Sequence, residues 1–466
     1  MVSLLNVAGL VPSPSPSSAG DAPPEGFVPF DQQLYGDSIW LVVAKAVILL
    51  VFLLVSVILA VWFERKVISR MQERIGPNVH GPAGLFQLIG DTIKLVVKED
   101  VSVSRASRVL YIAAPMVSVV CAMLVFSVIP IGPAARIPFT DDVTPIQLTD
   151  FTVAGLFVLA CSAIGVYGIV LGGWASGSTY PLLGAVRSTA QVISYEIAMG
   201  LSFVTVFIMS ASMYTQDIVS AQENLWFGVT LLPAFLLYIF AMVGETNRLP
   251  FDLPEAEGEL VAGYMTEYSS VKFAWYFLAE YINMLNVSAI ATTFFLGGWR
   301  APWPLSAVSD GVLNTGYWPV LWFLAKLWLL MFVFVWIRGS LMRLRYDQFM
   351  RLGWKVLIPV GLGWLALWGT ARLLATNDWF PHWVPDFQAA LRVAAVLMIV
   401  AIIVILLWPR KPEEDKGGRK RKPTEIDAHA GGFPVPPRPG EKLPPSPRSG
   451  RTVESRPRKR ESDRRG

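Results

Sequence analysis

Residues 39–63 read IWLVVAKAVILLVFLLVSVILAVWF, an apolar run in which Lys45 is the only basic residue and no acidic residue occurs. A helix needs about 20 residues to cross about 30 Å of hydrocarbon. The run is long enough, so it predicts a membrane-spanning helix. The composition agrees, because 53% of the 466 residues are hydrophobic and 16% are charged, whereas a soluble domain usually carries roughly 25% charged residues.

Further apolar runs of similar length follow the first one along the chain. The expected fold class is an all-α integral membrane protein with about nine transmembrane helices and a surface amphipathic helix. The expected crossings are 39–63, 109–131, 150–174, 191–213, 225–244, 270–297, 317–338, 354–376 and 388–408.

The basic residues predict the orientation of these helices. Loops rich in Lys and Arg alternate along the chain with loops that are poor in them, and the poor loops carry only Arg136 and Arg300. Cytoplasmic loops are normally enriched in Lys and Arg, so we expect the N-terminus outside, the C-terminus in the cytoplasm and a bacterial inner membrane. The loops rich in Lys and Arg alternate with the poor ones and are 64–108, 175–190, 245–269 and 338–353.

Four regions are expected from these patterns. Residues 1–38 form an irregular N-terminal arm, 39–376 the membrane core, and 377–408 an extra C-terminal transmembrane helix. Residues 409–466 are rich in Pro, Gly, Arg and Lys without an apolar period, which is typical of a disordered tail. A basic tail beside a membrane helix favours contact with anionic lipid or plain solvation over nucleic-acid binding.

The long loop 64–108 holds an amphipathic pattern. Leu85, Leu88, Ile89, Ile93 and Val96 recur at helical spacing, with polar residues between them. Such a helix lies at the membrane surface or packs on a partner protein, and both readings stay open.

The most informative segment is acidic. It runs from Gly244 to Glu267, and Arg248 is its only basic residue. Its carboxylates are crowded, and mutual repulsion and burial raise the pKa of some of them toward neutrality. A row of such groups passes protons at pH 7, whereas the simpler reading is a solvated loop that begins a helix. The six acids are Glu245, Asp252, Glu255, Glu257, Glu259 and Glu267.

Two further acids lie inside predicted crossings. Glu196 is in the fourth run and Glu280 in the sixth. A charge in the middle of a membrane costs several kcal/mol unless it is paired or hydrated, so such residues mark ion paths or fixed partners. Lys326, near the middle of the seventh run, is the candidate partner of a buried carboxylate.

Several kinds of chemistry lack the residues they need. Cys121 and Cys161 lie in apolar runs, and we interpret both as small hydrophobic residues. The three histidines are scattered, and no glycine-rich phosphate loop follows a strand. We therefore expect no metal and no cofactor bound by this chain, and no complete active site within it.

Several motifs resemble one known family, the H subunit of bacterial NADH:quinone oxidoreductase (respiratory complex I), the counterpart of mitochondrial NADH dehydrogenase subunit 1. The most specific is GETNRLPFDLPEAEGELVAGYMTEY at 244–268. The resemblance covers roughly residues 39–376. The other matching motifs are ERK at 64–66, MQERIGPN at 71–78, GDTIKLVVKED at 90–100, RSTAQVISYE at 187–196, YFLAEY at 276–281 and RYDQFM at 345–350.

The resemblance implies a membrane subunit that forms part of a quinone chamber and an acidic path into the membrane. Quinone would be the substrate, with FMN and iron–sulfur clusters in partner subunits. Expected partners are the hydrophilic-arm quinone-site subunits, the membrane-arm subunits and lipid. The acidic set would include Glu245, Glu255, Glu257, Glu259 and Glu280, with Glu196 as the intramembrane carboxylate. Residues expected to face the chamber or the partners are Arg65, Arg74, Asp91, Lys98 and Arg248.

The sequence departs from the family pattern in two places, and two other functions also fit part of it. The last crossing and the basic tail extend beyond the family core, and the stretch 339–343 is looser than the usual family form. A stand-alone proton or cation transporter would also account for Glu196, Glu280 and Lys326. A membrane subunit of a related hydrogenase-type complex would share the acidic segment in part.

Overall fold

A computed structural model describes residues 37–376 apart from 102, 105, 137–142, 224, 253–260, 303–311 and 315–316. Most of the arm 1–38, the last expected crossing 388–408 and the tail 409–466 lie outside the described residues.

The described chain is mostly helical. Its longer helices are α2 (Ile39–Met71), α4 (Arg108–Phe126), α5 (Ala154–Ala175), α6 (Thr179–Ser210), α9 (Leu232–Glu245), α11 (Ser270–Phe295), α13 (Trp318–Ser340) and α15 (Ile358–Thr376). Shorter elements are η2 (Pro82–Gly84), α3 (Gln87–Val97), α7 (Thr215–Ser220), α8 (Phe227–Thr230), η3 (Gly263–Met265), η4 (Val312–Asn314), α14 (Tyr346–Leu352) and the π-helical turn η5 (Gly353–Leu357).

Among the described residues, six helices are long and apolar enough to cross a membrane, by length and composition alone. They are α2, α4, α5, α6, α13 and the combined segment Tyr346–Leu373. The multi-pass membrane fold is therefore confirmed, while the count of nine crossings is not. The expected crossing 225–244 is split into α8 and the 14-residue α9, because the backbone leaves helical geometry at Leu231 just before Pro233.

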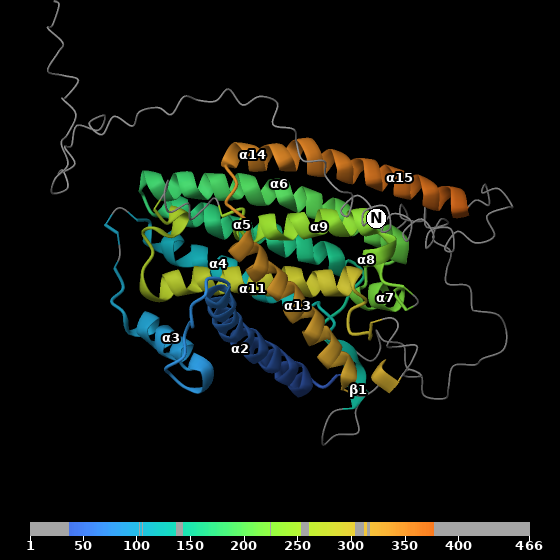
Figure 1. The fold of residues 1–466 in the computed structure, drawn as a ribbon, viewed down its shortest axis with the longest axis horizontal. Coiled ribbons are helices and arrows are strands. Elements are labelled where there is room, and N and C mark those ends of the chain that lie inside the picture. Colours follow the sequence, from blue (N-terminus) through green and yellow to red (C-terminus); the bar gives the residue numbers. More distant parts are fainter. Residues whose placement is uncertain are drawn as a thin grey trace, which may run out of the picture. The chain divides into compact units, whose positions relative to one another are not determined.

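Helix α11 lies at the centre of the packing. It contacts α4, α9, α13 and α2, and α5 pairs with both α4 and α6 (Figure 1). Every residue from Met284 to Phe295 is buried, as expected of a helix surrounded by others. Glu280 lies one turn before this buried stretch, so the fold holds its backbone rigidly.

The connections on one side of the bundle include an element that the sequence pattern did not predict. Strands β1 (Gly132–Arg136) and β2 (Val143–Ile146) pair antiparallel between α4 and α5, with Ala135 opposite Thr144. The long loops that follow α2 and α9 lie at the other ends of the helices. The site described next is on that second side.

Candidate functional site

A cavity of about 560 Å³ opens beside the last turns of α2. Helix α2 continues eight residues beyond the expected crossing, so Arg65 projects from a helix rather than from a loop. Arg65, Arg74, Arg248 and Arg338 line this space together with Glu64, and we call it the arginine cavity. The structure thus brings together three of the basic residues that the motifs indicated.

A buried ion cluster forms one wall of the arginine cavity. Glu64 is 4% exposed and pairs with Arg338 and with Arg248, whose Nη1 lies 3.5 Å from Glu64 Oε1. The Tyr281 hydroxyl donates to Glu64 Oε2 at 2.6 Å. Arg248 Nε lies 2.8 Å from Glu280 Oε1. Two carboxylates therefore meet two guanidiniums, which offsets the cost of burying unpaired charges.

The backbone around Arg248 is held by α6. Gln191 Nε2 donates to the carbonyls of Gly244 at 2.7 Å and of Phe251 at 2.9 Å. Asn247 adopts a left-handed conformation with φ of 52°, which asparagine tolerates better than most residues. The chain can therefore turn sharply after α9, and the turn directs Arg248 toward α2 and α11.

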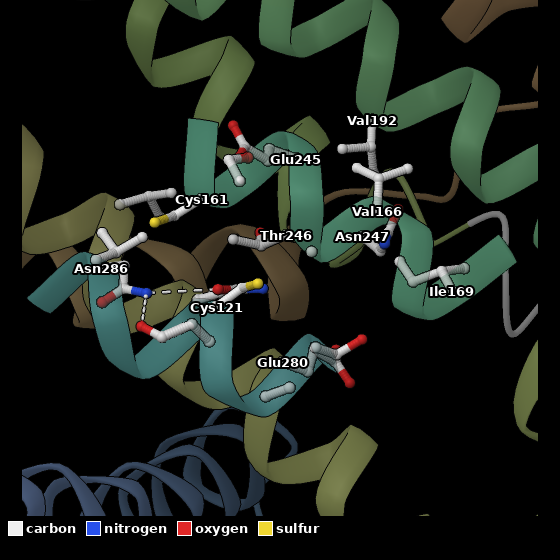
Figure 2. Close-up of a pocket in the computed structure, with 18 of the residues that line it drawn as sticks. Cys121, Cys161, Val166, Ile169, Val192, Glu245, Thr246, Asn247, Glu280 and Asn286 are labelled. Carbon is white, nitrogen blue, oxygen red and sulfur yellow. Dashed lines mark hydrogen bonds between the residues drawn. The ribbon is translucent and has the colours of Figure 1, made fainter. Parts of the chain in front are cut away.

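A second cavity, of about 70 Å³, lies between α4, α5, α6, α9 and α11. Glu245 and Glu280 both line it, and we call it the carboxylate cavity. Figure 2 shows Glu245 above and Glu280 below, with Thr246 between them in this view. Because Glu280 also pairs with Arg248, that ion pair forms the boundary between the two cavities.

The wall of the carboxylate cavity suits water. Its volume exceeds the roughly 10–15 Å³ that one water needs, and a buried water needs several polar partners. Ser162 Oγ donates to Glu245 Oε1, while Oε2 of the same carboxylate is buried. Within the described part of the chain, the buried wall oxygens without a hydrogen-bond partner are Ser118 Oγ, Glu245 Oε2, Asn247 Oδ1 and Asn286 Oδ1.

Glu196 lies on α6 near this second cavity without lining it. Its side chain is partly buried, and Val192 and Met199, one turn before and after it, line the cavity. Ile193 and Ile197 beside it are exposed at 47% and 42%, so this face of α6 looks outward from the described bundle. The fold therefore brings Glu280, Glu245 and Glu196 into one neighbourhood.

The predicted amphipathic helix is present as α3. Leu88 is buried, while Ile89, Ile93 and Val96 are 46–60% exposed. Arg65 Nη1 donates to Asp91 at 2.7 Å, and this hydrogen bond holds the pKa of Asp91 below its ordinary value. The backbone carbonyl of Lys98 accepts from Ser270 Oγ at 2.8 Å, so α3 is attached in its middle and at its C-terminal end.

Lys326 does not lie beside a carboxylate in the described structure. Its ammonium donates to the carbonyls of Leu296 at 2.6 Å, Gly298 at 2.9 Å and Arg300 at 2.6 Å. It also lies 4.5 Å from the ring centre of Trp226. The expected carboxylate partner is thus replaced by the carbonyls that follow the end of α11, which a lysine satisfies well.

Two further acids of the predicted set lie outside both cavities. Asp252 and Glu267 are half-buried and line neither cavity. Glu267 contributes its backbone carbonyl, which accepts from the Tyr111 hydroxyl at 2.5 Å. Glu255, Glu257 and Glu259 lie outside the described residues.

Sequence reasoning missed several residues of the site. Glu64, Tyr281 and Arg338 complete the ion cluster. Glu64 and Tyr281 lie in motifs that carry the family resemblance, but none of the three was named as a site residue. Glu64 and Arg338 each end an apolar run, and an ionisable residue at such a position was an available signal. Cys121 and Cys161, interpreted as packing residues, are buried free thiols on the wall of the carboxylate cavity.

Comparison with known proteins gives two findings. Residues 44–369 match the family described as NADH dehydrogenase. The chain is also similar to the H subunit of the NADH-quinone oxidoreductase of Streptomyces avermitilis. The two are 51% identical over 422 residues, which cover 90% of this chain and 91% of that relative.

Proposed function

Since this chain belongs to the NADH dehydrogenase family and is a membrane subunit of NADH-quinone oxidoreductase, or complex I, we propose that its two cavities couple quinone chemistry to proton movement. The arginine cavity forms part of the quinone chamber. The carboxylate cavity begins an acidic path into the membrane. The observation that carries the proposal is the Arg248–Glu280 pair, because it belongs to both spaces at once.

The dimensions and charges of the arginine cavity support its role. Its volume of about 560 Å³ lies in the range of about 300–1,000 Å³ typical of small-molecule sites. Phe277 and Val61 supply apolar walls, and Arg65 and Arg74 supply positive charge. Such a mixture suits a quinone, which has an apolar body and carbonyl oxygens that gain negative charge on reduction.

The coupling step follows from electrostatics. Negative charge that develops on the quinone side attracts Arg248 and weakens its hold on Glu280. A carboxylate that loses its cationic partner binds a proton more readily. Water in the carboxylate cavity then connects Glu280 with Glu245, and Glu196 continues the path within α6. Moving one charge against 100 mV requires about 2.3 kcal/mol, which is comparable to a change of about two pKa units.

The wider assembly follows from the family. Other subunits of complex I are the partners. We propose that the hydrophilic-arm subunits at the quinone site cover the arginine cavity and α3, and that partner subunits of the complex hold the FMN and iron–sulfur clusters. Membrane-arm subunits would face α6 near Glu196. Asp252, Glu267 and the acids at 255, 257 and 259 would take part in coupling as members of the loop 245–267. Lys98 would dock a partner, and the arginine-cavity side would face the cytoplasm of a bacterial cell.

The test replaces each carboxylate by its neutral isostere in the assembled complex. Glu280→Gln and Glu245→Gln should lower NADH:quinone reductase activity and proton pumping by about tenfold or more, which corresponds to about 1.4 kcal/mol or more in the barrier.

A matched control is Glu223→Gln, because Glu223 is 72% exposed and pairs with Arg300 on the hairpin side. This control should keep parental rates. Parental activity and pumping in both cavity variants would refute the proposed path.

A further inference from the structure

A third cavity lies on the hairpin side, away from the two already described. Its volume is about 450 Å³, and it is bounded by the first turns of α2, the end of α4, the hairpin β1–β2 and the start of α13. Figure 1 shows α2 and α13 both running toward β1. Its walls are almost entirely apolar and include Leu49, Phe52, Phe126, Ile131, Val320 and Leu324.

The mouth of this pocket opens toward the bilayer. Helices α2 and α13 are both apolar enough to cross a membrane. Ile48 and Tyr317, which line the pocket, are 68% and 61% exposed, so the pocket is open at these residues. Water is poorly stabilised in such an apolar space, because a buried water needs several polar partners. The surrounding hydrocarbon chains are the apolar molecules that can enter from the side.

Aromatic residues define the depth of the pocket in the membrane. Trp40 and Trp318 lie in the first turns of α2 and α13 and are 80% and 49% exposed. Exposed Trp and Tyr residues mark the interface between headgroups and hydrocarbon. Lys45 follows Trp40 by five positions on the helix, which places its Cα about 7.5 Å deeper at 1.5 Å per residue. The pocket therefore begins in the outer part of one leaflet.

One polar group marks the end of the pocket near the interface. Lys45 is 16% exposed, and its ammonium lies 2.5 Å from an Asp37 oxygen and also contacts Thr144 Oγ1. Thr144 in turn donates to Asp37 at 2.9 Å. An ammonium has three N–H groups, and these two contacts use two of them. Lys45 can thus donate to the ester or phosphate oxygens of a lipid whose chain lies below.

We propose that this pocket is a phospholipid site. It holds one acyl chain from the leaflet on the hairpin side, with the ester and phosphate oxygens beside Lys45. The chain would fill the space between α2, α4 and α13. The site is independent of the proposed quinone and proton functions, because none of its residues lines either of those cavities.

The experiment uses the assembled complex in vesicles of phosphatidylcholine that carries a diazirine in one acyl chain. After irradiation, crosslinks at Phe52 and Leu324 in the pocket are compared with those at Leu329, which is 60% exposed on α13. Ala44→Trp places an indole at the mouth of the pocket, since Ala44 lines it. The matched control is Val47→Trp, which is in the next turn, 56% exposed and outside the pocket lining.

In Ala44→Trp, the ratio of pocket to surface crosslinks should fall about tenfold. This fall corresponds to a loss of about 1.4 kcal/mol in the free energy of lipid binding. The ratio should be unchanged in Val47→Trp, and NADH:quinone reductase activity should be kept in both. Equal ratios in the two variants would overturn the proposal.

A second measurement does not depend on that substitution being tolerated. A photoreactive amino acid at position 324 should capture phospholipid. Capture of quinone, of another subunit or of residues 1–36 of this chain would instead identify a different occupant and overturn the lipid assignment.

Discussion

Individual charged residues in this protein are satisfied in two different ways. Glu64 and Glu280 meet the guanidiniums of Arg248 and Arg338, and such pairs can be separated when a nearby charge changes. Lys326 instead donates to three fixed backbone carbonyls. The first arrangement suits a coupling element, while the second suits a structural anchor for the end of α11.

The contrast predicts the behaviour of Lys326→Met. The three carbonyls would lose a buried donor, and each unsatisfied buried group costs about 1–3 kcal/mol. We expect a lower thermal unfolding temperature of the complex, while the pH profile of quinone reduction stays parental. Lys355→Met, at an exposed position, should change neither. If Lys326→Met instead shifted the pH profile and left the unfolding temperature unchanged, Lys326 would be assigned to the proton path.

At the scale of elements, close approach of two helices positions the acidic path. Gly244, next to Glu245 on α9, packs against the ring of Tyr195 on α6. A Cβ at this position would lie 2.7 Å from Tyr195 Cγ, which is too close for a real contact. Tyr195 stacks on Phe349 with ring centres 4.3 Å apart, so the Tyr195 ring cannot easily move away from an added Cβ.

Gly244→Ala should therefore push α9 away from α6. Overpacking of this kind costs typically about 1–3 kcal/mol, and Glu245 would shift from its Ser162 contact. We expect a lower unfolding temperature together with reduced proton pumping. Gly363→Ala is the matched control on α15, since nothing lies within 4 Å of its added Cβ. Identical behaviour of the two variants would show that the close approach has no role.

At the scale of the whole molecule, the two sides of the bundle carry different polar networks. The ionic cluster lies on the side of the α2 and α9 loops. On the hairpin side, Asp150 accepts from the Thr215 and Gln216 backbone at the start of α7, with distances of 3.4 and 3.3 Å. Burial raises the pKa of Asp150 to about 6, although these hydrogen bonds oppose the shift.

Asp150 predicts how stability depends on pH. In the folded chain the Asp150 carboxyl keeps its proton up to about pH 6, whereas in the unfolded chain it releases the proton near its ordinary pKa of 3.8. The folded state binds more protons between these values, so this contribution to stability falls as pH rises through that window. Asp150→Asn should remove that slope in thermal unfolding of the complex, and Asp217→Asn, at an exposed position, should retain it. A slope that persists in Asp150→Asn would assign it to another group.

The helices of this protein were predictable because their signal is local. A run such as 39–63 carries its own hydropathy, and intramembrane acids such as Glu280 stand out against it. The family motifs likewise indicated Arg65, Arg74 and Arg248, which the arginine cavity brings together. The helices and the intramembrane acids needed only a few neighbouring residues and the cost of placing charge in hydrocarbon, whereas the three arginines also needed the family resemblance.

Packing determined which of these residues meet. Tyr281 bonds Glu64 although 217 positions separate them, and Lys326 found carbonyls instead of a carboxylate. The cavity between Glu245 and Glu280 exists because five helices leave a gap at their crossing. Partner choice depends on the relative rotation and tilt of whole helices. That geometry follows from the sum of many side-chain contacts, so no single segment of sequence contains it.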